Sequence, residues 1–188
     1  MILITYFYFM KFIITDEKKL SWALTALVSS VYPFLSLPYL TYEYCEYLKT
    51  DYFSSLAILY FIEYLALDLI LGCMYYYKEL GLLTSWIHHI LYIMYCTHMY
   101  FKGYTRAFMP CLLLEVPTSV LSIGRIFPHL RNDGLFGLTF FIFRILYNFF
   151  LIVRSTVDYE FTLVLCAMFC LHAYWFINWF LKYGYKIF

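Results

Sequence analysis

The feature that most constrains this fold is a series of apolar stretches separated by short polar breaks. An α-helix rises about 1.5 Å per residue, so about 20 apolar residues cross a hydrocarbon core of about 30 Å. The breaks contain charges, Gly and Asn, which end helices and favour turns. We therefore predict an all-α membrane protein, a bundle of about six transmembrane helices around a central polar or lipid cavity. The expected spans are 20–40, 53–77, 82–101, 105–124, 135–154 and 161–181.

The composition excludes an ordinary soluble domain. Of 188 residues, 64% are hydrophobic and 13% are charged, whereas soluble domains carry about 25% charged residues. A chain of this size cannot bury so much apolar surface away from water. We expect residues 20–188 to form one membrane domain. The apolar segment 1–19 is predicted to be interfacial or partly spanning.

The lysines and arginines are distributed unevenly between the two sides of the six predicted spans. Such a bias marks the cytosolic side, so both termini are expected to be cytosolic. The residues are scattered in short loops, and a nucleic-acid partner is not expected because it requires a clustered basic face. One side holds Lys11, Lys18, Lys19, Lys78, Arg125, Arg131, Lys182 and Lys186, and the other holds Lys49, Lys102, Arg106 and Arg154.

His88 and His89 lie in the middle of an apolar stretch, where ionisable side chains are costly and usually mark a site. Imidazole titrates near neutral pH and suits a general base. Asp68, on the preceding stretch, is expected at a depth comparable to His88, where it could orient a His tautomer. The alternative is a pair of interhelical hydrogen bonds that only holds helices together. A metal site with Asp68 or Glu115 as third ligand is not favoured, because no further His lies at i+4.

A second polar group is expected to line the same cavity and bind lipid. Glu115 begins a stripe that includes Thr118, and Pro117 is expected to kink that helix. Arg144 shares a face with Asn148 and requires an anion, which could be Asp68, Glu115 or a lipid phosphate or carboxylate. A structural Arg144–Glu115 pair remains an alternative. The predicted lipid-binding residues are Glu115, Arg144, Thr118, Tyr92 and Asn148.

Four stretches in order resemble the TLC domain family, which includes ceramide synthases and small TLC-domain-containing proteins. They are Tyr-Leu-Ala-Leu-Asp-Leu-Ile (64–70), Trp-Ile-His-His-Ile-Leu-Tyr (86–92), Leu-Leu-Leu-Glu-Val-Pro-Thr-Ser-Val-Leu (112–121) and Phe-Phe-Ile-Phe-Arg-Ile (140–145). The resemblance implies about six helices around a lipid-accessible cavity, with Asp68, His88, His89, Glu115 and Arg144 at the recurrent polar positions. The match to the ceramide synthase motif ends after His89, so the chain is more similar to the small branch, which is linked to lipid homeostasis.

The leading functional prediction is a multi-pass protein that binds or remodels membrane lipids, either phospholipid or sphingolipid. One alternative is an acyltransferase in which His88, His89 and Asp68 are catalytic and acyl-CoA is the co-substrate. Another is a cargo receptor or membrane-protein helper that uses the loop Thr41–Asp51 as a partner surface. No resident cofactor is expected, and a dimer is left open. The endoplasmic reticulum membrane is the first expectation for location and the plasma membrane the second.

Overall fold

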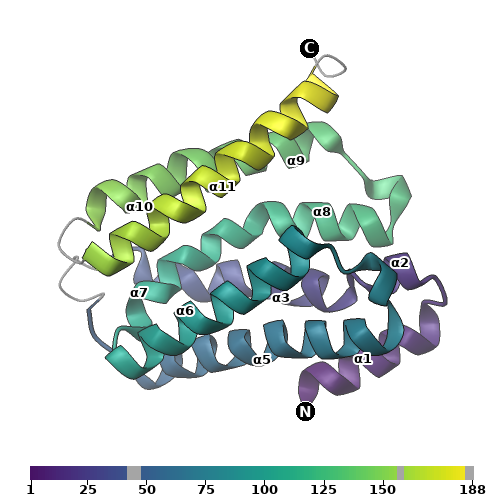
Figure 1. Cartoon of the computed structure of the whole chain (residues 1–188), viewed down its shortest axis with the longest axis horizontal. Helices are drawn as coiled ribbons and strands as arrows, with labels where there is room; N and C mark the ends of the chain where they lie inside the picture. Colours follow the sequence, from purple (N-terminus) through teal and green to yellow (C-terminus); the bar gives the residue numbers. More distant parts are fainter. Residues whose placement is uncertain (42–47, 156–158, 185–188) are drawn as a thin grey trace.

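The computed structural model describes residues 1–41, 48–155 and 159–184, and every regular element in these ranges is helical (Figure 1). The predicted all-α bundle is therefore confirmed. The elements are α1 (Ile2–Ile13), α2 (Glu17–Leu20), α3 (Ala23–Ser36), η1 (Leu37–Tyr39), α5 (Tyr52–Tyr75), η2 (Tyr77–Glu79), η3 (Leu82–Ile87), α6 (His88–Lys102), α7 (Thr105–Cys111), η4 (Leu112–Glu115), α8 (Val116–Ile126), η5 (Pro128–Leu130), α9 (Asp133–Phe140), η6 (Phe141–Tyr147), α10 (Asn148–Arg154) and α11 (Tyr159–Tyr183).

Within the described residues, 5 helical stretches are long and apolar enough to cross a membrane. They correspond to five of the six predicted spans. The remaining prediction, 82–101, forms the continuous helix η3–α6, which is of similar length. Its three histidines and several tyrosines make it less apolar than the other five. The five spans are Glu17–Tyr39, Tyr52–Tyr75, Thr105–Ile126, Asp133–Arg154 and Tyr159–Tyr183.

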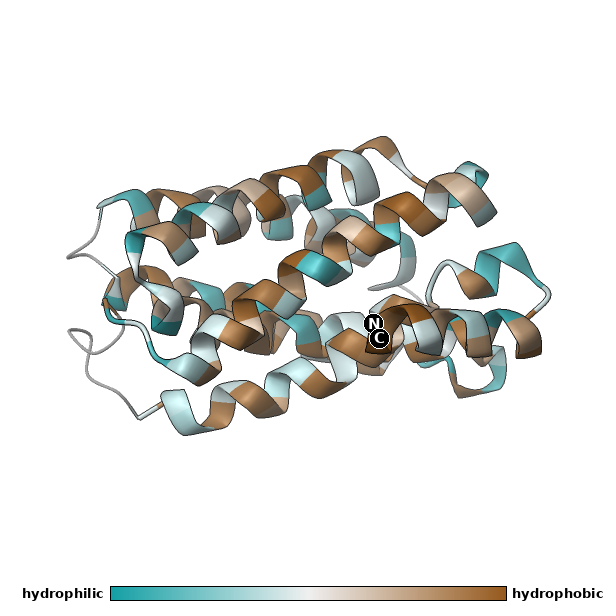
Figure 2. Cartoon of the chain, turned by 90° about the horizontal axis from the view of Figure 1, so that it is seen from below, coloured by the Kyte–Doolittle hydropathy of each residue, from teal (hydrophilic) through white to brown (hydrophobic). Residues whose placement is uncertain are grey.

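The spans divide into a buried group and an exposed pair. Half of the apolar window is buried in the spans that begin at Glu17, Tyr52 and Thr105, against 22% and 17% in the spans that begin at Asp133 and Tyr159. Figure 2 shows hydrophobic residues along the length of the long helices. Large apolar side chains such as Leu138, Phe149 and Ile177 point outward, as lipid-facing residues do in membrane bundles.

Helix α1 contains 12 residues, which gives a length of about 18 Å and is too short to cross the hydrocarbon core. It packs on the end of α5. The ring of Phe7 is fully buried, 5.6 Å from the ring centroid of Tyr75, and Lys11 Nζ lies 3.5 Å from the same centroid. The N-terminal ammonium lies 3.3 Å from Oε1 of Glu63, so this short apolar helix follows α5 from its end at Tyr75 to its middle.

The opposite end of the bundle, which we call the Asp51 end, is held by a dense set of polar contacts. Asp51 begins α5 with a capping box, in which its Oδ1 accepts the Ser54 backbone N–H at 2.7 Å. The same carboxylate accepts hydrogen bonds from Arg106 Nε at 2.7 Å and from the Tyr39 hydroxyl at 3.0 Å. These bonds join η1, α5 and α7. The predicted partner loop Thr41–Asp51 lies largely outside the described residues, since 42–47 are not described.

Candidate functional site in the bundle interior

A single cavity of about 570 Å³ occupies the half of the bundle far from Asp51. Its lining comes from α2 with the start of α3, from α5, from η2, from η3 with the start of α6, from η4 with α8, from α9 with η6, and from the end of α11. We call its outer limit the Arg125 end, where α2, η2 and the end of α8 lie, at the right in Figure 1. Ionisable lining residues are Lys18, Asp68, Glu79, His88, His89, Glu115, Arg125 and Arg144.

Asp68 is held by α5 at the inner wall of the cavity and is only 5% exposed. The hydroxyl of Tyr76 donates to its Oδ1 at 2.8 Å. Its other oxygen, Oδ2, lies 3.6 Å from Nδ1 of His89. Asp68 was expected at a depth comparable to His88, and the imidazole nearest to its carboxylate is that of His89, because the adjacent histidines point about 100° apart around the helix. At 3.6 Å this is a close contact and not a hydrogen bond, and within the described residues Nδ1 of His89 is buried without a hydrogen-bond partner.

His88 lines the same cavity from a different direction. Its ring centroid lies 4.4 Å from that of Tyr92 and 6.0 Å from that of Trp175. Within the described residues, its buried Nδ1 has no hydrogen-bond partner. Buried polar atoms without partners are uncommon and require an explanation such as a bound molecule. The two histidines therefore differ, since one faces a carboxylate and the other lies among aromatic rings.

Arg144 lies on the opposite wall and is anchored by neutral acceptors. Its Nε donates to the Leu114 carbonyl at 2.9 Å, and its Nη2 donates to the Thr118 hydroxyl at 2.6 Å. The oxygen Oε1 of Glu115 is 3.9 Å from Nη2. Pro117 has no N–H, and the short turn η4 ends just before α8. The predicted Arg144–Glu115 pair is thus present as a loose contact rather than a tight bond.

Two π-helical turns interrupt the helices that carry these residues. One, η3, runs directly into His88, and the other, η6, contains Arg144. Such turns are rare and frequently occur at functional sites. The extra residue in a π turn rotates the following side chains, and here it brings both groups to the cavity. Sequence periodicity predicted regular helices at both places.

Two of the predicted lipid-binding residues do not line the main cavity. Tyr92 borders a separate space of about 20 Å³ that it shares with Glu115 and His172. Asn148 is fully buried, and its Nδ2 lies 3.3 Å from Nδ1 of His172. His172 of α11 is buried as well, and its ring centroid lies 6.1 Å from that of Phe140. Asn148 and His172 thus form an interhelical contact.

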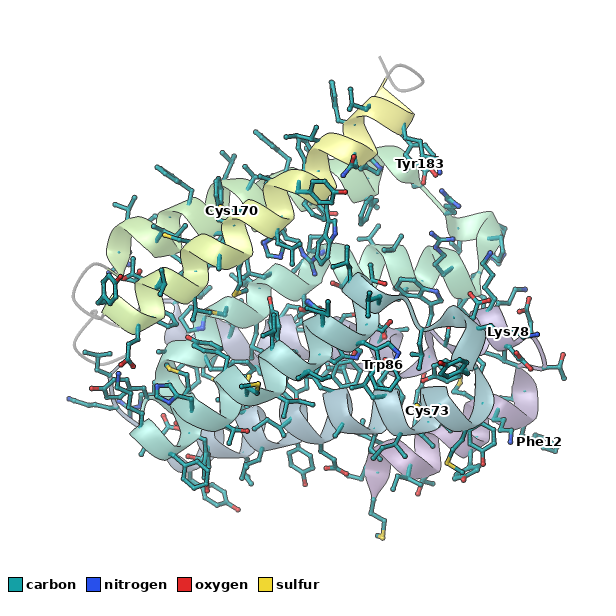
Figure 3. All side chains as sticks on the ribbon, viewed as in Figure 1. Phe12, Cys73, Lys78, Trp86, Cys170 and Tyr183 are labelled. Carbon is teal, nitrogen blue, oxygen red and sulfur yellow. The ribbon has the colours of Figure 1, made fainter. Side chains whose placement is uncertain are left out.

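The structure adds lining residues that sequence reasoning missed. Tyr76, Trp175 and Trp179 border the cavity, and so do the groups at its outer limit, Lys18, Trp22 and Arg125. Figure 3 shows Lys78 and Tyr183 toward this end of the bundle. The sequence signal that could have identified these residues is the occurrence of Lys, Trp and Arg at the predicted membrane interface. Within the described residues, no three His, Cys, Asp or Glu side chains are grouped to hold a metal ion.

The helical fold and the apolar spans define a multi-pass integral membrane protein with a polar cavity. No family profile, no curated protein and no solved structure matches this chain significantly.

Proposed function

We propose that the protein binds a membrane lipid with its polar headgroup in the main cavity, as part of a TLC-type role in lipid homeostasis. The observation that carries the proposal is a cavity of about 570 Å³ in which ionisable residues face one another inside an apolar bundle. Ligand pockets typically measure about 300–1,000 Å³. Ionisable groups at membrane depth are expensive and are retained where they serve a site.

The headgroup, rather than the acyl chain, would supply most of the selectivity. An apolar chain gains little when it moves from lipid to protein. Arg144 and Glu115 are 3.9 Å apart, which leaves each of them capacity to bond a polar occupant. Thr84, an exposed residue of η3, borders the cavity. Its position supports an opening through which the acyl chain of the lipid would reach the bilayer.

The experiment extracts the protein with its surrounding membrane in polymer nanodiscs and identifies the lipids by mass spectrometry. We expect one lipid class to be enriched over the bulk membrane, and Arg144→Ala to reduce that enrichment about ten-fold, as expected for the loss of a charge-assisted bond. Arg154→Ala is the matched control, since Arg154 is exposed near the Asp51 end, away from this cavity. A wild-type lipid profile identical to that of the bulk membrane would contradict the proposal.

A second function, acyl transfer, is favoured by one specific observation, the contact between Asp68 and His89. In this version His89 Nε2 takes a proton from an amine or hydroxyl acceptor, while Asp68 orients the ring through Nδ1. The acceptor forms the new bond to the acyl carbon of acyl-CoA, the thioester bond breaks, and the thiolate leaves and takes up the proton. His88 would contact the acceptor among the aromatic rings.

Turnover separates the two functions. Acyl-CoA and a sphingoid base or lysolipid are incubated with wild type, His89→Ala and Asp68→Asn, with His98→Ala as the control because His98 is an exposed partner of Glu160. Removal of a general base lowers the rate by about 10²- to 10⁴-fold. No turnover with any acceptor would eliminate acyl transfer and leave lipid binding intact.

The location belongs to the same proposal. We propose the endoplasmic reticulum membrane, with the Arg125 end in the cytosol because most lysines and arginines lie there. Glycosylation sites introduced at the two ends of the bundle test this orientation. Modification at the Arg125 end would reverse it.

A further inference from the structure

The outer part of the cavity contains two cations that have no ionic partner among the described residues. Lys18 is exposed on α2, and Arg125 is half-buried near the end of α8. Both residues line the cavity, and α2 packs against α8. Within the described residues, the acidic side chains at this end form no ion pair with either cation; they are Asp16, Glu17, Glu79 and Asp133. Asp133 is bound to Arg131, with Oδ1 2.9 Å from Nε.

The Arg125 guanidinium lies beside Trp22, and one of its N–H donors has no acceptor among the described residues. Its guanidinium carbon lies 5.7 Å from the ring centroid of Trp22, a distance typical of cation–π contacts. Its Nε is buried and has no hydrogen-bond partner within the part of the chain that the structure describes. A guanidinium group has five N–H donors in a planar fork that matches phosphate and carboxylate oxygens. The residue therefore has an unused donor with which it can bind an anion.

Lys18 is held in place by the cap of its own short helix. The Asp16 carboxylate accepts the backbone N–H of Lys18 at 2.9 Å and that of Lys19 at 3.4 Å. Asp16 thus orders the turn that carries the ammonium group. Within the described ranges, the ammonium forms no salt bridge with a carboxylate.

We infer that Lys18, Trp22 and Arg125 form a phosphate-binding subsite at the Arg125 end of the cavity. This inference rests on the proposed function and specifies its ligand class, a lipid with a phosphate in the headgroup. Deeper polar groups such as Arg144 and Glu115 would contact the rest of the headgroup. A guanidinium and an ammonium on separate helices can each bond a different oxygen of one phosphate group. The same chemistry would accept free inorganic phosphate or a soluble phosphate ester.

The test compares Lys18→Gln/Arg125→Gln with Lys19→Gln/Lys182→Gln, which removes the same charge at the same end without touching the cavity lining. Each protein is purified in an alkyl glycoside detergent, which contains no phosphate, with phosphatidylglycerol or diacylglycerol added, and the lipid retained after gel filtration is measured by mass spectrometry. We expect the cavity variant to lose about ten-fold of its phospholipid retention, as for charge-assisted bonds. Diacylglycerol retention and the control variant should be unchanged.

A second arm distinguishes the source of the phosphate. Inorganic phosphate is titrated into detergent-solubilised protein and binding is followed by Trp22 fluorescence, with Trp22→Phe to assign the signal. Saturable binding that Lys18→Gln/Arg125→Gln removes, without phospholipid retention in wild type, supports the subsite with a soluble ligand and contradicts lipid binding. If Arg144→Ala loses lipid but Lys18→Gln/Arg125→Gln binds phospholipid and phosphate like wild type, the subsite is refuted and the proposed function stands.

Discussion

The two halves of the bundle contain acid–base pairs of similar type but bond them differently. At the Asp51 end, Arg106 Nε lies 2.7 Å from Asp51 Oδ2, and Tyr39 and Ser54 bond the same carboxylate. In the cavity, Arg144 and Glu115 are 3.9 Å apart, and His89 and Asp68 are 3.6 Å apart. Short, fully bonded pairs fix helices in place. Longer pairs beside a cavity leave donors and acceptors for another molecule, so distance separates a structural role from a binding role here.

The largest expected effect on stability is that of Asp51→Ala. It removes a helix cap and a charge-assisted bond to Arg106, and we expect the free energy of unfolding to fall by about 2–4 kcal/mol. Titration with a denaturing detergent, followed by circular dichroism, measures this change. Lipid retention should remain at the wild-type level. Loss of lipid together with stability would break the contrast between the two halves.

Gly137→Ala is expected to act on the cavity half instead. An added Cβ would collide with the Trp179 ring at Cη2, so the indole ring, which lines the cavity, must move. Overpacking of this kind costs about 1–3 kcal/mol. We expect a shifted tryptophan emission and reduced lipid retention, whereas Leu138→Ala, at an exposed neighbour, should change neither. Unchanged lipid retention in Gly137→Ala would show that Trp179 does not shape the binding space.

Tyr76→Phe measures how much the hydrogen bond from the Tyr76 hydroxyl to Asp68 contributes to the stability of the cavity half. The hydroxyl of Tyr76 is buried and donates at 2.8 Å, and its removal leaves Oδ1 short of a donor. The expected loss is about 1–2 kcal/mol, smaller than for Asp51→Ala. Phe7→Leu, which changes a neighbouring buried ring without a hydrogen bond, is the control. A loss as large as that of Asp51→Ala would assign Asp68 a mainly structural role.

The smallest effect is the dependence of stability on pH at the Asp51 end. Partial burial raises the pKa of Asp51, but hydrogen bonds from the Ser54 N–H, Arg106 and Tyr39 outweigh it, and the net pKa is below the usual 3.8. The pKa of this carboxyl group is lower in the folded protein than in the unfolded chain. Its ionised form therefore stabilises the folded protein at pH values above the unfolded-state pKa, and this stabilisation is lost as the pH falls through the folded-state pKa. Thermal unfolding between pH 6 and pH 3 should therefore show a loss that begins near pH 3.8 and grows as the pH falls further. Asp51→Asn should flatten that part of the profile, and an unchanged profile would reject the assignment.

The sequence predicted the helical class and the membrane spans because both depend on local properties. The length of an apolar run and the residues that break it can be counted without knowledge of any neighbour. The same reasoning identified Asp68, His88, His89, Glu115 and Arg144 as polar residues at membrane depth, and all five line the cavity. The resemblance to the TLC domain family remains a prediction, together with the functions derived from it.

Finer features of the site depended on how distant helices are rotated and tilted. The sequence predicted Asp68 at a depth comparable to His88, and the packing of α5 against α6 places the imidazole of His89 nearest to its carboxylate. Tyr92 and Asn148 shared the helical faces of site residues, yet they lie away from the main cavity. Rotation and tilt are set by contacts between segments far apart in the chain, and periodicity within one segment does not contain them.

The amino-acid sequence by itself determined that the chain forms membrane-spanning helices with buried charges, since the cost of polar groups in hydrocarbon applies to each segment separately. Only the tertiary structure decided which charges meet, which are fully bonded and where a cavity remains. The two π turns and the approach of Lys18, Trp22 and Arg125 arise from packing, because side chains on different helices come together only when the whole bundle is assembled.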